Sequence, residues 1–271
     1  SFVSPRTRNT LAPNLTTEKT LSGDINYAFN MNGYSVRVTG FYTKITDQTD
    51  LMSFYDDSQN SFTNFAVSGI DQRHAGVELG FAVPLPLNGL SFQGALNWGD
   101  YVYTSTPDVI QTIDNDGEVV LDSNVPYWSG HNIYRRNPDG SLYLDSFGDP
   151  VVAERERHYV PSTPQIAASL GLDYSNNYLF AGIDLQYFDK MYLDMNPLYR
   201  TDMAVNGPDD KWTPVELEYM ASQEKFDPVF LLNASIGKSW YIDRKYNFGF
   251  SLNVQNILNN KDVKTGGYEQ T

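Results

Sequence analysis

The chain has 271 residues, of which 41% are hydrophobic and 14% aromatic, so it carries too much apolar surface for a disordered chain. Its formal net charge of −14 argues against a nucleic-acid partner, because phosphate binding needs clustered Lys and Arg. The sequence contains no cysteine, which excludes disulfides, thiolate metal sites and cysteine nucleophiles.

The hydrophobic residues alternate with polar ones rather than forming long runs. No apolar run comes near the roughly 18 residues that indicate a transmembrane helix. In residues 21–30, Leu21, Ile25 and Phe29 share one face, whereas Asp24 and Asn26 share the other. Successive side chains of a strand point to opposite faces, so this pattern predicts a strand with one apolar and one polar face.

The same alternation predicts about eight strands along the chain. In chain order they are residues 21–30, 34–42, 75–81, 90–98, 166–174, 179–187, 230–240 and 248–254. Their lengths lie near the roughly 9–11 residues that cross a bilayer at a tilt. Many have Tyr, Trp or Phe at an end of the apolar stripe, as interfacial aromatic girdles do.

The connections between these strands alternate in length. Residues 30–33, 84–89, 175–177 and 242–245 are short turns, whereas residues 47–73, 100–163 and 188–227 are long connections. Within the second long connection, NPDG at residues 137–140 predicts the tip of a small hairpin. Short periplasmic turns and long extracellular loops are typical of outer-membrane barrels. The predicted fold is therefore an all-β, antiparallel transmembrane β-barrel, with residues 1–271 as part of one barrel domain.

The polar faces of the strands would line the lumen of such a barrel. These residues are Asp24, Arg37, Glu78, Gln93, Asp173, Asp184, Asn233, Asn253 and Gln255. The apolar stripes carry almost no charge; the exception is Lys238, near a predicted strand end where its amine can reach the interface.

Several segments resemble the barrel of TonB-dependent receptors of the Bacteroidetes type. They are NLTTEKTLSGDINYAF, YSVRVTGFYTKITD, NFAVSGIDQRHAGVELGFAVPL and, most specifically, SLNVQNILN at residues 251–259. The similarity is greatest to variants with an N-terminal carboxypeptidase-regulatory-like domain. The resemblance implies a 22-strand barrel, of which this chain would hold about eight strands.

The resemblance also implies partners that this sequence does not contain. The family has a plug domain and a TonB box before the barrel and a last strand ending in an aromatic residue, whereas this chain stops at GGYEQT. We therefore expect a piece of a larger polypeptide, or pairing with other chains. The expected partners are outer-membrane lipid, the rest of the barrel and plug, the TonB complex acting through the plug, and a surface lipoprotein.

Two clusters in the long connections contain residue types that bind metals. Glu154, Glu156 and His158 share one strand face in ERERH; the alternative is a solvated strand. Asp114, Asp116 and Glu118 place an acid at every second position, as a calcium loop does. No Glu follows at the twelfth position, however, and an Asn-Asp-Gly turn explains these residues equally well. We expect no metal and no cofactor.

The three histidines do not indicate an enzyme. His74, His131 and His158 lie in no recognisable nucleophile motif, and GxSxG and HExxH are absent from the sequence. The predicted function is uptake of a glycan, peptide or metal chelate with TonB-derived energy. The alternatives are a passive porin-like channel and a soluble β-sandwich binding module.

Aromatic residues of the long connections are candidates for solute binding. They are Tyr127, Trp128, Tyr134, Tyr143, Tyr199 and Trp212. Aromatic platforms there would hold a sugar or a peptide; the alternative is that they pack the loops on one another.

Overall fold

The computed structural model describes residues 16–57, 59–113, 117–161, 163–206, 212–243 and 245–262. In these residues the strands are β1 (Lys19–Met31), β2 (Tyr34–Asp56), β3 (Ser61–Pro84), β4 (Leu90–Tyr103), β5 (Asp108–Ile113), β6 (Val119–Asn124), β7 (Gly130–Tyr134), β8 (Val152–Arg157), β9 (Ile166–Asn176), β10 (Leu179–Asp189), β11 (Val229–Ile242) and β12 (Tyr246–Val254). The helices are η1 (Leu198–Arg200), α1 (Asp202–Val205) and α2 (Pro214–Ala221). None of these helices is long and apolar enough to cross a membrane.

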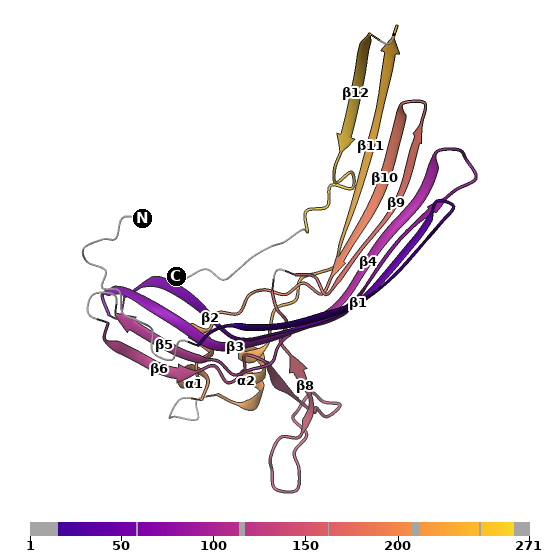
Figure 1. Ribbon diagram of the computed structural model, residues 1–271. Coiled ribbons are helices and arrows are strands. Elements are labelled where there is room, and N and C mark those ends of the chain that lie inside the picture. Colours follow the sequence, from indigo (N-terminus) through magenta and orange to yellow (C-terminus); the bar gives the residue numbers. More distant parts are fainter. Residues whose placement is uncertain are drawn as a thin grey trace.

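The eight predicted strands form one antiparallel sheet. Its order is β1-β2-β3-β4-β9-β10-β11-β12, so each strand pairs with the next of the eight along the chain (Figure 1). This up-and-down order is the arrangement of a barrel wall. A soluble β-sandwich would need two such sheets packed face to face, and the described residues place all eight strands in one.

The short connections are tight turns at one end of this sheet, which we call the turn side. Asn32 and Gly33 have φ of 51° and 85°, and Asn177 and Tyr178 have φ of 48° and 60°. Two successive positive φ values give a turn whose twist matches that of the flanking strands, and Asn and Gly adopt this conformation at low cost. The opposite end, where the long connections lie, is the loop side.

The outer face of the sheet is apolar and exposed. Ile25, in the middle of β1, is 83% exposed, and Trp98 of β4 is 64% exposed. Aromatic residues lie toward both ends of this face: on the loop side Tyr42, Trp98, Tyr187 and Phe230, and on the turn side Phe29, Tyr34, Trp240 and Phe248. Lys238 donates to the carbonyl of Asn177 in a turn, so its amine reaches the edge of the apolar band.

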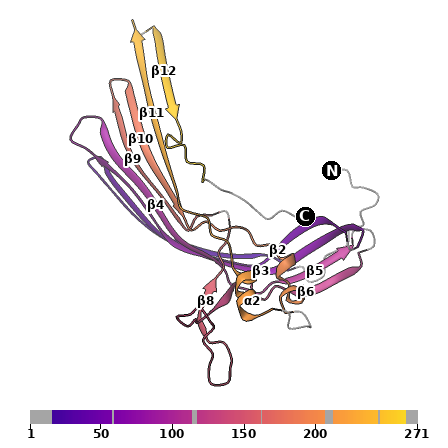
Figure 2. The ribbon, with the colours of Figure 1, turned by 180° about the vertical axis from the view of Figure 1, so that it is seen from behind.

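The prediction of a long loop at residues 47–73 was wrong. β2 and β3 remain paired until Asp56 and Ser61, so that the connection is only the tip of a long hairpin. A register shift between Ile45 and Asp50 bends the hairpin. Figures 1 and 2 show its loop-side half turning away from the other strands of the sheet. β5 and β6 add to this half, which buries apolar residues of β3 and therefore stabilises the extension.

The long connections fold into a compact unit that we call the loop module, comprising the described residues within 48–70, 100–165 and 190–228. Its hydrophobic core consists of Phe65, Val67, Ile70, Tyr103, Val109, Val125, Trp128 and Met195. Val109 and Val125 are fully buried. The apolar side chains of the eight paired strands face outward, whereas those of the loop module pack against each other. This packing holds the long connections in fixed positions.

α2 was not predicted, although the sequence contains its start signal. Thr213 and Glu216 form a capping box, with Pro214 at the first helical turn. Glu218 of α2 accepts from the backbone N–H of Tyr134 at 3.2 Å, which fixes the helix against β7. The β7–β8 hairpin continues into the predicted NPDG turn, where the N–H of Gly140 donates to the Asn137 carbonyl at 2.9 Å.

Candidate functional site

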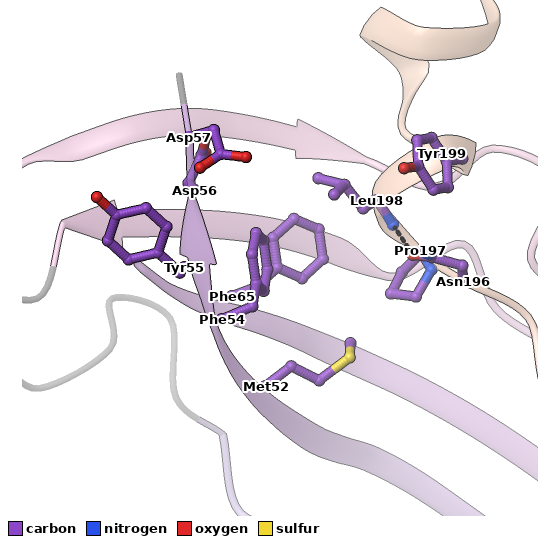
Figure 3. Close-up of a pocket in the computed structure, with 10 residues that line it drawn as sticks. All are labelled: Met52, Phe54, Tyr55, Asp56, Asp57, Phe65, Asn196, Pro197, Leu198 and Tyr199. Carbon is purple, nitrogen blue, oxygen red and sulfur yellow. Dashed lines mark hydrogen bonds between the residues drawn. The ribbon is translucent and has the colours of Figure 1, made fainter. Parts of the chain in front are cut away.

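Two adjoining cavities lie between the loop-side half of β2 and the segment 194–199. The outer chamber, about 430 Å³, is lined by Met52, Phe54, Tyr55, Asp56, Asp57, Phe65, Asn196, Pro197, Leu198 and Tyr199 (Figure 3). The inner chamber, about 270 Å³, is lined by Gln48, Thr49, Asp50, Met52, Val67, Ile70, Gln72, Tyr103, Trp128, Val160, Pro161, Asp194, Met195 and Pro197. Met52 and Pro197 line both, so we treat the two chambers as one loop cleft.

The segment 194–199 is held by its own side chains and by the core. The Asn196 carboxamide oxygen accepts from the N–H of Leu198 at 2.9 Å, the bond drawn in Figure 3. The Asp194 carboxylate accepts from the N–H of Met195 at 2.9 Å, and the Met195 side chain is buried in the core. This wall of the cleft is therefore preformed rather than loose.

The outer chamber combines aromatic surface with carboxylates. The rings of Phe54 and Phe65 lie 6.3 Å apart between centroids, and Figure 3 shows them between Tyr55 and the Asn196–Tyr199 segment. Asp56 accepts from the Gln111 carboxamide at 2.7 Å, which fixes one carboxylate at the mouth. Such an apolar base with a few directed polar groups is typical of a ligand pocket.

The inner chamber contains polar groups that lack a protein partner. Trp128 is 5% exposed and packs against Tyr103, with ring centroids 5.2 Å apart. Neither its Nε1–H nor the hydroxyl of Thr49 has a hydrogen-bond partner among the described residues. A buried donor without an acceptor is costly, so an acceptor on a solute would be stabilised here.

The charges that line the cleft are all negative. Its lining contains Asp50, Asp56, Asp57 and Asp194, and among the described residues no Lys, Arg or His lines either chamber. Burial, with a smaller contribution from the charge of Asp50, raises the pKa of Asp194. A raised carboxyl pKa means that the charged form is destabilised, and a nearby cation would offset this.

Two of the six aromatic candidates line the cleft: Tyr199 in the outer chamber and Trp128 in the inner one. The other four lie elsewhere in the loop module. The hydroxyl of Tyr127 lies 3.5 Å from the Asn206 side chain, and Tyr134 is on β7. Tyr143 lies beneath the Arg135 guanidinium, and the Trp212 indole donates to the Ala204 carbonyl. Of these contacts, that of Tyr127 joins two of the long connections, whereas those of Tyr143 and Trp212 are local.

Sequence reasoning missed the residues that β2 contributes to the cleft. Met52, Phe54, Tyr55 and Asp56 of β2, and Asp57 directly after it, lie in a stretch that was expected to be a long connection. Apolar residues stand side by side here, as Leu51 with Met52 and Phe54 with Tyr55, so period-2 alternation does not mark the stretch as a strand.

The histidines of the loop module form a buried pair. His131 Nδ1 lies 3.0 Å from His158 Nε2, and His158 is fully buried. Burial, with the nearby charge of Arg200 and of His131, lowers the pKa of His158 to about 3, so that the ring is neutral at physiological pH. The pair joins β7 to the end of β8 and is part of the packing.

The candidate metal ligands do not converge. Glu154 is exposed on β8, and the Glu156 carboxylate lies 3.7 Å from His131 Nε2. Within the described ranges no group of three His, Asp or Glu side chains could hold a metal ion. Asp114 and Asp116 of the second cluster lie outside the described residues, whereas Glu118 is described.

The polar faces of the spanning strands form a connected surface. Asp184 accepts from Asn233 at 2.9 Å and from Gln186 at 3.1 Å, and Gln93 donates to Asp173 across the sheet. A hollow of about 490 Å³ on this face is lined by residues that include Arg37, Thr39, Glu78, Asn97 and Gln186. The expected lumen residues thus share one polar surface.

An open antiparallel sheet with an apolar outer face, a polar inner face and aromatic bands at both ends is a section of an outer-membrane β-barrel wall. The family model described as "TonB dependent receptor-like, beta-barrel" matches residues 1–257, and the chain belongs to this family. It is therefore an outer-membrane protein whose long connections are extracellular.

Comparison with solved structures finds the outer membrane transporter YddB from Escherichia coli, with 13% sequence identity and a TM-score of 0.44. The match covers 91% of this chain but only 29% of that chain. Comparison with curated proteins gives no match.

Proposed function

We propose that this chain is part of the barrel of an outer-membrane receptor that takes up a solute with TonB-derived energy. Residues 1–271 would form part of one barrel domain, related to the Bacteroidetes type, whose lumen holds a plug on which the TonB complex acts. A surface lipoprotein would be a further partner. The family membership and the continuous polar inner face support this proposal. In this function the chain carries out no chemistry; it binds the solute and encloses its path.

The loop cleft is the proposed site of solute capture. The observation that carries this proposal is a preformed cleft lined by aromatic rings and four Asp side chains, with no cationic side chain from the described part of the chain. Carboxylates attract cations, and aromatic rings bind both apolar groups and cations. Of the three solute classes predicted from sequence, a peptide with basic and apolar side chains fits this lining best.

The test uses the full-length receptor in outer membranes and a fluorescent peptide of alternating Lys and Leu. We expect saturable binding that weakens with salt, and at least about tenfold weaker binding (roughly 1.4 kcal/mol) for the double variant Asp57→Asn, Tyr199→Ala. Tyr143→Ala and Glu154→Gln remove an aromatic ring and a carboxylate outside the cleft, and these control variants should bind like the parent. Equal binding of the parent to the same peptide with Glu in place of Lys would contradict the proposal.

The porin-like alternative differs in its energy requirement. Uptake into cells should stop when an uncoupler removes the proton gradient, while binding at the surface persists. Uptake that continues unchanged in uncoupled cells would favour a passive channel.

A further inference from the structure

Four charged side chains gather on the outer face of the sheet, directly beyond the loop-side aromatic band. Lys44 follows Tyr42 by two residues on β2, and Asp100 follows Trp98 by two residues on β4, so each shares the outer face with its aromatic neighbour. Arg73 of β3 is the register partner of Lys44. Two residues of strand correspond to about 7 Å, which places these charges at the level where headgroups adjoin the aromatic band.

Arg157 joins this group from the loop module. The chain that follows β8 pairs with the end of β4: Val102 bridges Tyr159, and the N–H of Tyr103 donates to the His158 carbonyl at 3.1 Å. This pairing brings the Arg157 guanidinium to the outer face, where its Nη1 lies 2.8 Å from Asp100 Oδ2.

The cations of this group outnumber its acids. Arg73 Nη2 lies 2.6 Å from Asp100 Oδ2, the same oxygen that Arg157 contacts. Lys44 is exposed and forms no ion pair with another described residue. The group therefore contains three cations and one carboxylate, which leaves a local charge of about +2 in a chain whose formal net charge is −14.

The next acids have other partners. Asp189, two residues beyond Tyr187 on β10, pairs with Lys225 at 3.3 Å. Asp47 pairs with Lys19 at 2.8 Å, and Asp71 accepts from the N–H of Asp47 at 3.0 Å. The side chains of Arg73 and Arg157 are 37% and 48% exposed, so both remain partly accessible.

We propose that Lys44, Arg73 and Arg157 bind the phosphate of a lipid headgroup in the outer leaflet. Guanidiniums form charge-assisted hydrogen bonds to phosphate oxygens, and Asp100 holds the two guanidiniums together so that both act on one group. Basic side chains at the membrane boundary attract anionic headgroups through the same electrostatics. Lipid is the occupant because the cluster continues the apolar, lipid-facing surface of β2, β3 and β4, so that acyl chains would lie along the wall while the headgroup is bound. This site is separate from the loop cleft and does not depend on which solute is taken up.

The test measures lipid retained by the full-length receptor after it is purified in detergent and incubated with bis-phosphorylated lipid A. Native mass spectrometry should detect bound lipid A on the parent, at least about tenfold weaker binding for the triple variant Lys44→Gln, Arg73→Gln, Arg157→Gln, and weaker binding as salt rises. Arg37→Gln on the inner face and Lys238→Gln on the turn side are matched controls that should retain lipid.

Three results would overturn the proposal. They are equal retention by the parent and the folded triple variant, equal retention of dephosphorylated lipid A, and equal binding of inorganic phosphate in place of lipid. If the triple variant does not migrate as a folded barrel before heating, Lys44→Gln alone replaces it, since that change leaves both Asp100 ion pairs intact. An unchanged affinity for lipid A in Lys44→Gln would then count against the site.

Discussion

Arg200 shows how a single half-buried cation organises the loop module. Its Nη1 and Nη2 donate to the carbonyls of Ala221 and Ser222 at 2.6 and 2.7 Å, at the end of α2. These carbonyls have no partner within the helix, so the guanidinium satisfies groups that would otherwise need water. Burial lowers the pKa of Arg200 to about 10, which leaves it charged at physiological pH.

Arg200→Met should therefore loosen the loop module. Two charge-assisted hydrogen bonds are lost, and at about 1.5–3 kcal/mol each before relaxation we expect a local destabilisation of about 2–4 kcal/mol. Hydrogen exchange of α2 amides in the full-length receptor measures this change. Arg135→Met, in an exposed position above Tyr143, is the matched control and should leave the exchange of α2 unchanged.

The buried histidine pair predicts that the loop module becomes less stable in acid. The pKa of His158 is lowered to about 3 in the folded protein, whereas the unfolded chain has an ordinary pKa near 6.5. Below about pH 6.5 the unfolded form binds a proton that the folded form excludes, so stability falls as pH falls, by at most about 1.4 kcal/mol per pH unit for this histidine.

The rate of protease cleavage within the loop module should accordingly rise as the pH falls from 7 to 5. His158→Gln keeps a polar side chain but cannot titrate, so its cleavage rate should change less over this range. A parent receptor whose cleavage is independent of pH would contradict this account.

At the scale of elements, α2 depends on local signals more than on burial. It is 8 residues long and buries only Ala221, so its capping box and its contacts to β7 carry much of its stability. Asn177 and Tyr178 likewise determine the β9–β10 turn locally through their positive φ values. Such elements can be found from sequence when the start or turn signal is recognised.

Thr213→Ala should destabilise α2 by about 1 kcal/mol, because the hydroxyl that accepts from the N–H of Glu216 is lost. Faster hydrogen exchange in residues 216–221 measures the effect. Thr213→Ser keeps the hydroxyl and should exchange like the parent; if both variants exchange equally fast, the cap is not the cause.

At the scale of the whole molecule, the two faces of the barrel wall have opposite requirements. Ile183 lies near the middle of β10 on the outer face, whereas Gln186 faces the polar hollow on the inner side. An Arg at the lipid midplane costs about 2–4 kcal/mol, while an Arg in an aqueous lumen is tolerated.

Ile183→Arg should therefore reduce barrel stability by about 2–4 kcal/mol, and Gln186→Arg, which introduces the same side chain on the other face, by much less. Denaturant titration of the full-length barrel in lipid vesicles measures both. Equal destabilisation by the two variants would contradict the assignment of the faces.

Much of the fold could be predicted because strand periodicity is a local property. The alternation of Leu21, Ile25 and Phe29 with Asp24 predicted β1, and seven similar patterns predicted the other spanning strands in their order. The extension of β2 and β3 could not be predicted in the same way, because its stability comes from pairing with β5, far along the chain. Lipid-facing and core-facing apolar residues also look alike in a sequence.

The sequence by itself determined the barrel wall, since every second residue of a spanning strand must suit lipid and the alternate residue must suit a polar interior. Only the tertiary structure decided the sites. It placed Tyr199 beside Phe54 in the loop cleft, turned Trp128 into the core, and brought Arg157 to Arg73 and Asp100. These groupings join residues from distant connections, and their physical cause is the burial of a shared hydrophobic core, which no local pattern encodes.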